Sequence, residues 1–406
     1  MSYFGELRQH IRPLAAASIG SGTGISLFAY FASVFAPHLV KAFGWSRAQF
    51  ALVGLTMLAS FFVLPVVGRL TDRYGVLRMA TFGTFLLPFC LLGFALQQGP
   101  LWHYLVASTG VLALGSLTST LVYTRLIAEN FVRATGLALT IVNCVPAALA
   151  IGAVPLLNWL IEAQGWRTGY FAVAGFTFAA GLLALSLIPR KPAEGPAEAA
   201  AKPAKPVSAK RDYRTIFASR TFWLIFAGMM LCLMQVPLHS SQMNLMLVDQ
   251  QISTQTAANI VSIYAFGTLV GRIACGLALD RFPTPLVTSL SMVLPSLGFF
   301  LLASDINTVP VIAASMFMVG LSIGAEGDLM SYLIARYFKI EIYNTVLGLI
   351  FSTSYLAAAM GAFGISRTLA IFDSFSPYLY FVSGTVAVGS LLFLLLPWPR
   401  ECEKVG

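Results

Sequence analysis

Residues 68–79, GRLTDRYGVLRM, close a long apolar segment with charged residues, and part of this motif returns later in the chain. The pattern G-x-L-x-D-R occurs at 68–73 as GRLTDR and, 208 positions later, at 276–281 as GLALDR. Each copy follows a run of apolar residues of similar length. A motif that recurs at matching places in two halves indicates a chain built from two copies of one helical unit.

The composition places this chain in a membrane. Of its 406 residues, 58% are hydrophobic and 10% are charged, whereas soluble domains have about 25% charged residues. Too few polar side chains are available to cover a water-exposed surface, so we expect an integral protein of the lipid bilayer. The excess of 25 Lys and Arg over 16 Asp and Glu fits basic cytoplasmic loops, and we expect no binding to nucleic acid.

A transmembrane helix needs about 20 apolar residues, and twelve segments of this kind can be marked. They lie near 13–38, 48–70, 76–97, 101–127, 134–160, 167–189, 220–247, 256–279, 284–304, 308–334, 343–370 and 376–397. The segment between the sixth and seventh spans is rich in Pro, Ala, Lys and Glu, which is typical of a flexible linker. We therefore predict an all-α membrane fold of two pseudo-symmetric six-helix bundles, 1–189 and 220–406, joined by a linker at 190–219.

The distribution of basic residues predicts the orientation. With the N-terminus inside, the loops after the even-numbered spans, the linker and both tails hold most of the Lys and Arg residues. Because cytoplasmic loops collect these residues, we expect both termini in the cytoplasm and the protein in the plasma (inner) membrane.

Together, the twelve spans, the repeat, the basic linker and the motif G-x-L-x-D-R-x-G resemble the major facilitator superfamily. Gly68, Asp72, Arg73 and Gly75 match the family's loop motif. The resemblance implies a gating role for Gly68, Asp72 and Arg73 and, in the second copy, for Asp280 and Arg281. That copy departs from the pattern, with Pro283 in place of a glycine. The alternative is that these are ordinary interfacial charges that set the topology.

A narrower resemblance is to the monocarboxylate-porter and oxalate/formate-antiporter branches. It rests on TGLALTIVN after span 4, an Arg in span 8 and GAEGDLMSYLIARYF in span 10, and it implies an organic anion as substrate. Two features depart from these branches: Thr268 stands where the porters place an Asp, and span 11 has no cation. The second departure disfavours a dicarboxylate held by two fixed cations.

Three charged residues lie well inside the predicted spans: Arg272, Glu326 and Asp328. At a rise of about 1.5 Å per residue, Arg272 lies about 12 Å from the end of span 8 at Asp280. Asp328 and Glu326 lie about 12 and 15 Å from Arg336 at the end of span 10. All three are therefore near the middle of a hydrocarbon core roughly 30 Å thick, where a cation and two acids can compensate each other.

These charges predict substrate binding and coupling. A guanidinium matches a carboxylate bidentately, so Arg272 is the expected binding residue, with Glu326 or Asp328 as the proton-coupling acid. The two acids are about 200° apart around a helix, so they face different directions. There is a slight preference for Asp328 as the acid that faces the cavity, but the sequence does not decide between the two. Without substrate an acid pairs with Arg272, and an arriving carboxylate releases that acid to take a proton. The alternative is a static ion pair that locks span 8 to span 10.

Weaker candidates for substrate contact are polar side chains within the spans. They are Tyr30, Tyr123, Asn143, His239, Gln242, Ser352 and Tyr355. A membrane-embedded Tyr is more often a packed aromatic with a satisfied hydroxyl, and His239 could instead relay protons or bond a neighbouring helix.

Other function classes lack their motifs. The chain has no G-x-x-x-x-G-K-[ST], H-E-x-x-H or G-x-S-x-G, so we expect no enzyme activity, no cofactor and no metal. The predicted function is secondary active transport of a small organic anion, a monocarboxylate, by alternating access with proton symport. Its expected partners are the carboxylate, protons and lipid, with the chain acting as a monomer. Anion exchange without protons and proton-coupled drug efflux are the alternatives, and spans 1–6 contain none of the buried acids that efflux usually needs.

Overall fold

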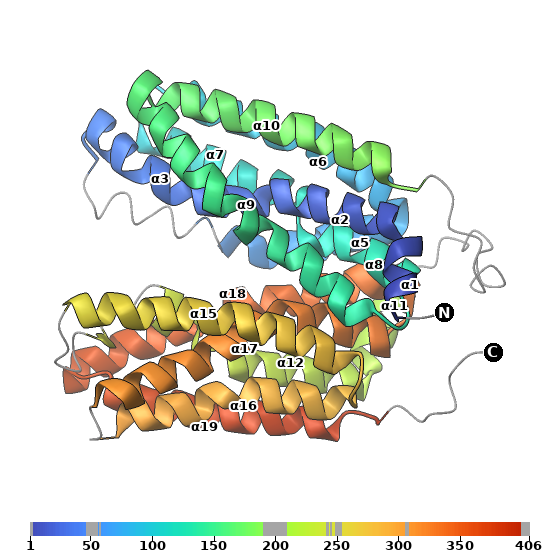
Figure 1. Cartoon of the computed structure of the whole chain (residues 1–406), viewed down its shortest axis with the longest axis vertical. Helices are drawn as coiled ribbons and strands as arrows, with labels where there is room; N and C mark the ends of the chain where they lie inside the picture. Colours follow the sequence, from blue (N-terminus) through green and yellow to red (C-terminus); the bar gives the residue numbers. More distant parts are fainter. Residues whose placement is uncertain are drawn as a thin grey trace. The chain divides into compact units, whose positions relative to one another are not determined.

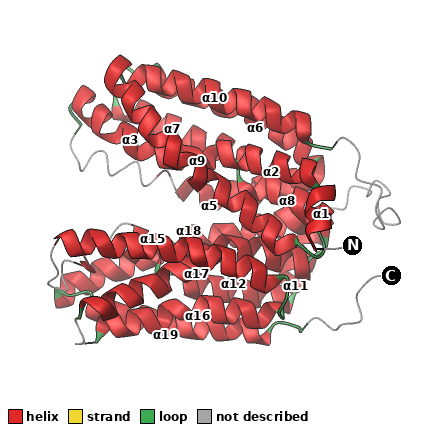
Figure 2. Ribbon diagram, in the orientation of Figure 1, coloured by secondary structure: helices red, strands yellow, loops and turns green. Residues whose placement is uncertain are grey.

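The computed structural model describes residues 3–45, 56, 58–189, 209–240, 243, 246–247, 254–304 and 308–398. Over these residues the ordered elements are all helices and no strand is present (Figure 2). The chain forms two compact units (Figure 1). The first contains residues 1–209 and 338–352, and the second contains residues 210–337 and 353–406.

The first unit is built from the N-terminal helices. They are α1 (Tyr3–Gln9), α2 (Ile11–Thr23), α3 (Ile25–Phe43), α5 (Leu58–Tyr74), α6 (Val76–Ala95), α7 (Leu101–Gly115), α8 (Thr120–Asn130), α9 (Thr135–Gln164) and α10 (Trp166–Leu187). The 3-10 turn η2 (Ser116–Thr118) joins α7 to α8, and η4 (Ile340–Ile342) with the start of α18 (Tyr343–Phe372) also belongs to this unit.

The second unit holds the C-terminal helices and the rest of α18. They are α11 (Ala209–Ala218), α12 (Arg220–Leu233), α13 (Val236–Ser240), α15 (Thr254–Leu279), α16 (Thr284–Ala303), α17 (Val309–Tyr337) and α19 (Ser376–Leu392), followed by η5 (Phe393–Leu395).

Eleven helical segments among the described residues are long and apolar enough to cross a membrane. They correspond to every predicted span except the second, at 48–70. That span is represented by α5, which has 17 residues, because residues 46–55 and 57 are not described. The prediction of an all-α membrane fold is confirmed. The predicted linker at 190–219 falls mostly on residues 190–208, outside the described part of the chain.

Aromatic packing forms the core of the first unit. The rings of Phe35 and Tyr170 stack with centroids 3.8 Å apart, and Phe94 lies 5.2 Å from Tyr170. The indole N–H of Trp45 donates to the Gly99 carbonyl at 2.9 Å. These contacts join α3, α6 and α10 through close aromatic packing, and van der Waals packing of this kind stabilises helices against each other in a membrane.

A carboxylate holds the N-terminal helix against this unit. Glu6 in α1 is buried and accepts hydrogen bonds from the backbone N–H groups of Val132 at 2.8 Å and Ala134 at 2.8 Å. These N–H groups lie just before α9, where the helix dipole favours a negative charge.

In the second unit the seventh predicted span is broken between α12 and α13, at Met234 and Gln235. The break frees the Met234 carbonyl, which accepts a hydrogen bond from the Tyr378 hydroxyl of α19 at 2.8 Å. A neighbouring helix thus satisfies the backbone group that the break exposes, as a membrane interior requires.

Candidate functional site

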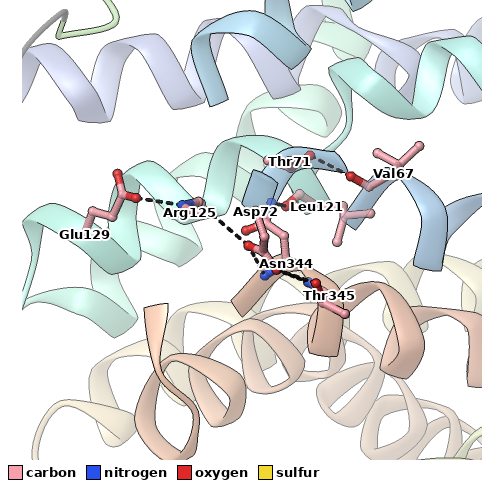
Figure 3. A network of polar contacts seen from close by, with 8 residues as sticks. All are labelled: Val67, Thr71, Asp72, Leu121, Arg125, Glu129, Asn344 and Thr345. Carbon is pink, nitrogen blue, oxygen red and sulfur yellow. Dashed lines mark hydrogen bonds and ion pairs between the residues drawn. The ribbon is translucent and has the colours of Figure 1, made fainter. Parts of the chain in front are cut away.

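A network of polar contacts surrounds Asp72 in the last turn of α5 (Figure 3). Its Oδ1 accepts from Nη1 of Arg125 at 2.7 Å and from the backbone N–H of Asn344 at 3.0 Å. Its Oδ2 accepts from the backbone N–H and the hydroxyl of Thr345, both at 2.6 Å. All four residues belong to the first unit. The carboxylate therefore lies at the N-terminus of α18, where free backbone N–H groups and the helix dipole favour a negative charge.

Arg125 in α8 is the cation of this network. It forms ion pairs with Asp72 at 2.7 Å and with Glu129, one turn later, at 2.6 Å. The side chains of Arg125 and Asp72 are 13% and 2% exposed, whereas that of Glu129 is 38% exposed. The Arg125–Asp72 pair is therefore largely removed from water, and its charge-assisted hydrogen bonds hold a defined geometry.

The protonation of Asp72 reflects two opposing effects. Burial raises the pKa of its carboxyl from 3.8 to about 6, while Arg125 and the hydrogen bonds from Thr345 and Asn344 act in the opposite direction. Asp72 lies two residues beyond the predicted span at 48–70. The carboxyl thus titrates close to the physiological range, with desolvation as the larger effect.

Close backbone packing surrounds the same carboxylate. A Cβ at Gly68 would overlap the carbonyl oxygen of Asn344, so only glycine allows this approach of α5 to the start of α18. The Asn344 side-chain amide donates to the Leu121 carbonyl of α8 at 2.9 Å. The first turn of α18 is therefore held by α5 and α8 together.

The other predicted gating residues differ in their surroundings. Arg73 is exposed, with its guanidinium 5.2 Å from the centre of the Tyr74 ring. In the second copy Arg281 is exposed, and Asp280 is half-buried and interacts electrostatically with Tyr332. The gating role of Gly68, Asp72, Arg73, Asp280 and Arg281 stays a prediction.

In the second unit, glycines allow α15 and α17 to pack backbone against backbone. The two helices lie side by side (Figure 1). At each of four glycines an added Cβ would overlap a backbone oxygen of the facing helix. They are Gly267 and Gly271 in α15 and Gly320 and Gly324 in α17. Two GxxxG patterns therefore face each other, a form of packing common between membrane helices.

This packing brings Arg272 against α17. Its Nε donates to the carbonyl of Gly324 at 3.2 Å, and the side chain is half-buried. The charge therefore lies beside the backbone of span 10, at the level of the two acids.

The two acids have different neighbours. Glu326 is half-buried and interacts electrostatically with Arg272, Tyr264 and Cys232. Asp328 is fully buried and interacts with Cys275. The structure thus gives Glu326 an electrostatic relationship to Arg272, and the slight sequence preference for Asp328 as the cavity-facing acid remains untested.

His239 lies near this group of charges. Its Nδ1 is 3.1 Å from the hydroxyl of Tyr264, and its buried Nε2 has no hydrogen-bond partner within the described residues. Tyr264 thus contacts His239 and interacts electrostatically with Glu326.

The remaining candidates have different surroundings within their own units, and their role in substrate binding stays a prediction. Tyr123 is buried against Gly20, where an added Cβ would overlap its ring, which matches the packed-aromatic alternative. Tyr30 is 44% exposed. The Ser352 hydroxyl donates to the Gly348 carbonyl of its own helix at 2.8 Å. Asn143 and Tyr355 are half-buried, and Gln242 lies outside the described residues.

Comparison with known proteins identifies the family. The family model of the Major Facilitator Superfamily matches residues 14–362 and 242–402. The chain belongs to this superfamily. It is therefore a multi-pass membrane carrier and not an enzyme, and a small molecule is its substrate.

Solved structures with this superfamily fold cover nearly the whole chain. A fucose:proton symporter from E. coli shares 12% identity over 97% of this chain and 99% of its own, with a TM-score of 0.72. A bacterial homologue of the iron transporter ferroportin shares 15% identity over 97% and 99%, with a TM-score of 0.69. The human organic anion transporter MFSD10 (TETRAN) shares 12% identity over 96% and 99%, with a TM-score of 0.68. At such identities the likeness establishes the fold alone, and no curated protein matches the sequence.

The sequence alone does not reveal that Arg125, Asn344 and Thr345 are the partners of Asp72. In the sequence Arg125 is one of many basic loop residues, and Asn344 and Thr345 carry no charge. The close helix pair has a readable signal, because GTLVG (267–271) and GLSIG (320–324) are both GxxxG patterns in predicted spans.

Proposed function

We propose that this superfamily member moves a small monocarboxylate across the membrane by alternating access, with one proton in symport. The proposal rests on one observation: Arg272, at mid-depth in its helix, donates from its Nε to the Gly324 carbonyl of α17 at 3.2 Å, and α17 is the helix that carries Glu326 and Asp328. Charged side chains at this depth are costly, and those that are present usually serve a function. The natural ligand of Arg272 is an anion that replaces the acid.

Arg272 supplies carboxylate recognition. Its Nε is engaged by the Gly324 carbonyl at 3.2 Å, which holds the side chain in a fixed orientation. A guanidinium carries five N–H donors in a planar fork, a geometry that matches the two oxygens of a carboxylate. A lysine would keep the charge and lose this fork.

Coupling to a proton follows from the same pair. When a substrate carboxylate takes over Arg272, Glu326 loses the cation that favours its ionised form. The acid then binds a proton, and the combined charge of the group stays unchanged through the cycle. One proton accompanies each carboxylate.

The names of two structural neighbours are compatible with anion transport and with proton symport. One neighbour is an organic anion transporter and another is a proton symporter. The basic loops support the proposed orientation, with both termini cytoplasmic in the plasma membrane. We retain the two-bundle division at 1–189 and 220–406 and the monomeric state as part of the proposal.

A thermal-shift screen of purified protein against a panel of carboxylates tests anion binding. We expect one or more monocarboxylates to raise the melting temperature of the wild type and to have no effect on Arg272→Ala. The matched control is Arg367→Ala, which removes a cation near the C-terminal end of α18. An unchanged profile in Arg272→Ala would refute the role of Arg272.

Uptake into proteoliposomes tests the coupling. With the carboxylate found in the screen, an inward proton gradient alone should drive accumulation, and a proton uncoupler should abolish it. Exchange of labelled for unlabelled carboxylate without any response to the pH gradient would favour the anion-exchange alternative.

A further inference from the structure

Two surface grooves lie at equivalent positions of the two sequence repeats. The first runs between α5 and α6 in the first unit and has a volume of about 530 Å³. The second runs between α15 and α16 in the second unit and has a volume of about 420 Å³. The offset of 208 positions that relates the two G-x-L-x-D-R motifs also relates their linings. The grooves are therefore two versions of one feature of the ancestral unit.

The correspondence holds for six of the seven residues that line the first groove, all except Leu117. Leu70, Met79, Phe82 and Leu86 of the first groove match Ala278, Val287, Leu290 and Leu294 of the second. At these positions both grooves are apolar. One matched pair is equally open, since Phe82 is 56% exposed and Leu290 is 58% exposed.

The two remaining pairs differ in chemistry. Tyr74 of the first groove corresponds to Phe282, and Arg78 corresponds to Leu286. The first groove therefore has a phenol and a guanidinium where the second has only hydrocarbon. One copy has a polar end, and the other is apolar at both of these positions.

Arg78 is available to a ligand. It is exposed, it stands in the first turn of α6, and that turn contains no acidic residue. Arg73 is a second cation nearby, with its guanidinium 5.2 Å from the centre of the ring of Tyr74, which lines the groove. In the part of the chain that the structure describes, Arg78 forms no hydrogen bond or ion pair with another side chain.

The apolar residues that line the groove extend along α6 away from Arg78. Arg78 and Leu86 are eight residues apart on α6, which corresponds to about 12 Å along the helix. Phe82 lies between them with more than half of its surface exposed. On a membrane-spanning helix such a surface faces lipid chains, and the first charged residue at its end lies near the headgroups.

We propose that the α5–α6 groove binds an anionic phospholipid, with its phosphate on Arg78 and one acyl chain along Phe82 and Leu86. Basic pockets between transmembrane helices suit acidic headgroups, whose attraction adds to acyl-chain contact. The α15–α16 groove receives an acyl chain without a preference for the headgroup. This proposal depends on the membrane fold and not on the substrate of transport.

Quenching by brominated lipids tests the proposal. Phe82→Trp and Leu290→Trp place a fluorescent reporter at the equivalent point of each groove, and the signal of the parent protein, which has six tryptophans, is subtracted. The protein is reconstituted in vesicles of phosphatidylcholine with a minority of phosphatidylglycerol. In one preparation the phosphatidylglycerol is brominated, and in the other the phosphatidylcholine is brominated. In Phe82→Trp we expect brominated phosphatidylglycerol to quench with an apparent affinity about fivefold higher than brominated phosphatidylcholine, the effect of one basic residue.

The repeat supplies matched controls. In Phe82→Trp/Arg78→Gln the headgroup preference should disappear while quenching by the two lipids persists, which also shows that the groove is intact. In Leu290→Trp no preference is expected until Leu286→Arg introduces one. Equal quenching by both lipids in Phe82→Trp, or a preference unchanged by Arg78→Gln, would overturn the proposal.

Discussion

Thr345 donates two hydrogen bonds to one carboxylate oxygen of Asp72, from its backbone N–H and from its hydroxyl, each at 2.6 Å. The two residues are 273 positions apart in the chain. The acid of the family's loop motif therefore binds the N-terminus of α18, with Arg125 of α8 as its ion-pair partner. The motif's own Arg73 is exposed.

We predict that Arg125→Gln destabilises the protein more than Arg73→Gln. Loss of Arg125 leaves the buried Asp72 carboxylate without its cation, and breaking such a pair costs about 3 kcal/mol. Arg73 is exposed, so its replacement should change stability by about 0.5 kcal/mol or less. Thermal unfolding of the purified variants in detergent measures both effects.

A double variant separates lost charge compensation from lost packing. Asp72→Asn/Arg125→Gln removes the uncompensated charge, so it should be more stable than Arg125→Gln alone. If the double variant is less stable than the wild type by the sum of the two single effects, the pair is not coupled.

The raised pKa of Asp72 predicts a pH dependence with a definite sign. The folded protein holds this proton with a pKa of about 6, whereas the ordinary value is 3.8. The folded state therefore binds more protons than the unfolded state in this window, and the contribution of Asp72 to stability increases as the pH falls through it. As the pH falls from about 6 to 3.8, the difference in unfolding free energy between wild type and Asp72→Asn should shift in favour of the wild type by up to about 3 kcal/mol. A difference that is constant between these two pH values, or that shifts the other way, would contradict the desolvation argument.

The helices of this region and its acid could be predicted from the sequence, but the partners of that acid could not. The motif and the apolar runs predict the helices and single out Asp72, because periodicity and local charge are properties of neighbouring residues. The partners Asn344 and Thr345 could not be predicted, since they bind largely through backbone N–H groups, which nearly every residue has. Arg125 could not be distinguished from other interfacial arginines without knowing which face of α8 it occupies.

We predict that Gly324→Ala impairs both stability and transport, while Gly327→Ala does neither. A Cβ at Gly324 would overlap the Thr268 carbonyl oxygen, whereas a Cβ at Gly327 meets nothing within 4 Å. The first change must separate α17 from α15 at the point where Arg272 is held, at a cost of about 1–3 kcal/mol. Melting temperature and carboxylate uptake by the two variants in parallel measure the difference, and equal behaviour would show that this contact is not tight in the membrane.

The sequence predicts how deep in the membrane the charged residues of the candidate substrate site lie, but not in which direction they face around their helices. Counting residues from Asp280 and Arg336 brings Arg272 and the two acids to one level, because the rise per residue of a helix is constant. Which acid faces Arg272 depends on how α17 is turned against α15. That turn is determined by the facing glycines and by packing that a single sequence does not reveal.

We predict that Glu326→Gln and Asp328→Asn affect different steps. Glu326 interacts electrostatically with Arg272, so its neutral variant should lose accumulation driven by a pH gradient while it keeps exchange of labelled for unlabelled carboxylate. Asp328 is fully buried beside Cys275, so Asp328→Asn should mainly lower stability and reduce both activities together. Gradient-driven uptake and exchange, measured in the same proteoliposomes and normalised to folded protein, distinguish the two patterns. If Asp328→Asn alone separates uptake from exchange, Asp328 is the coupling acid, and if neither variant does, no proton is carried by this pair of acids.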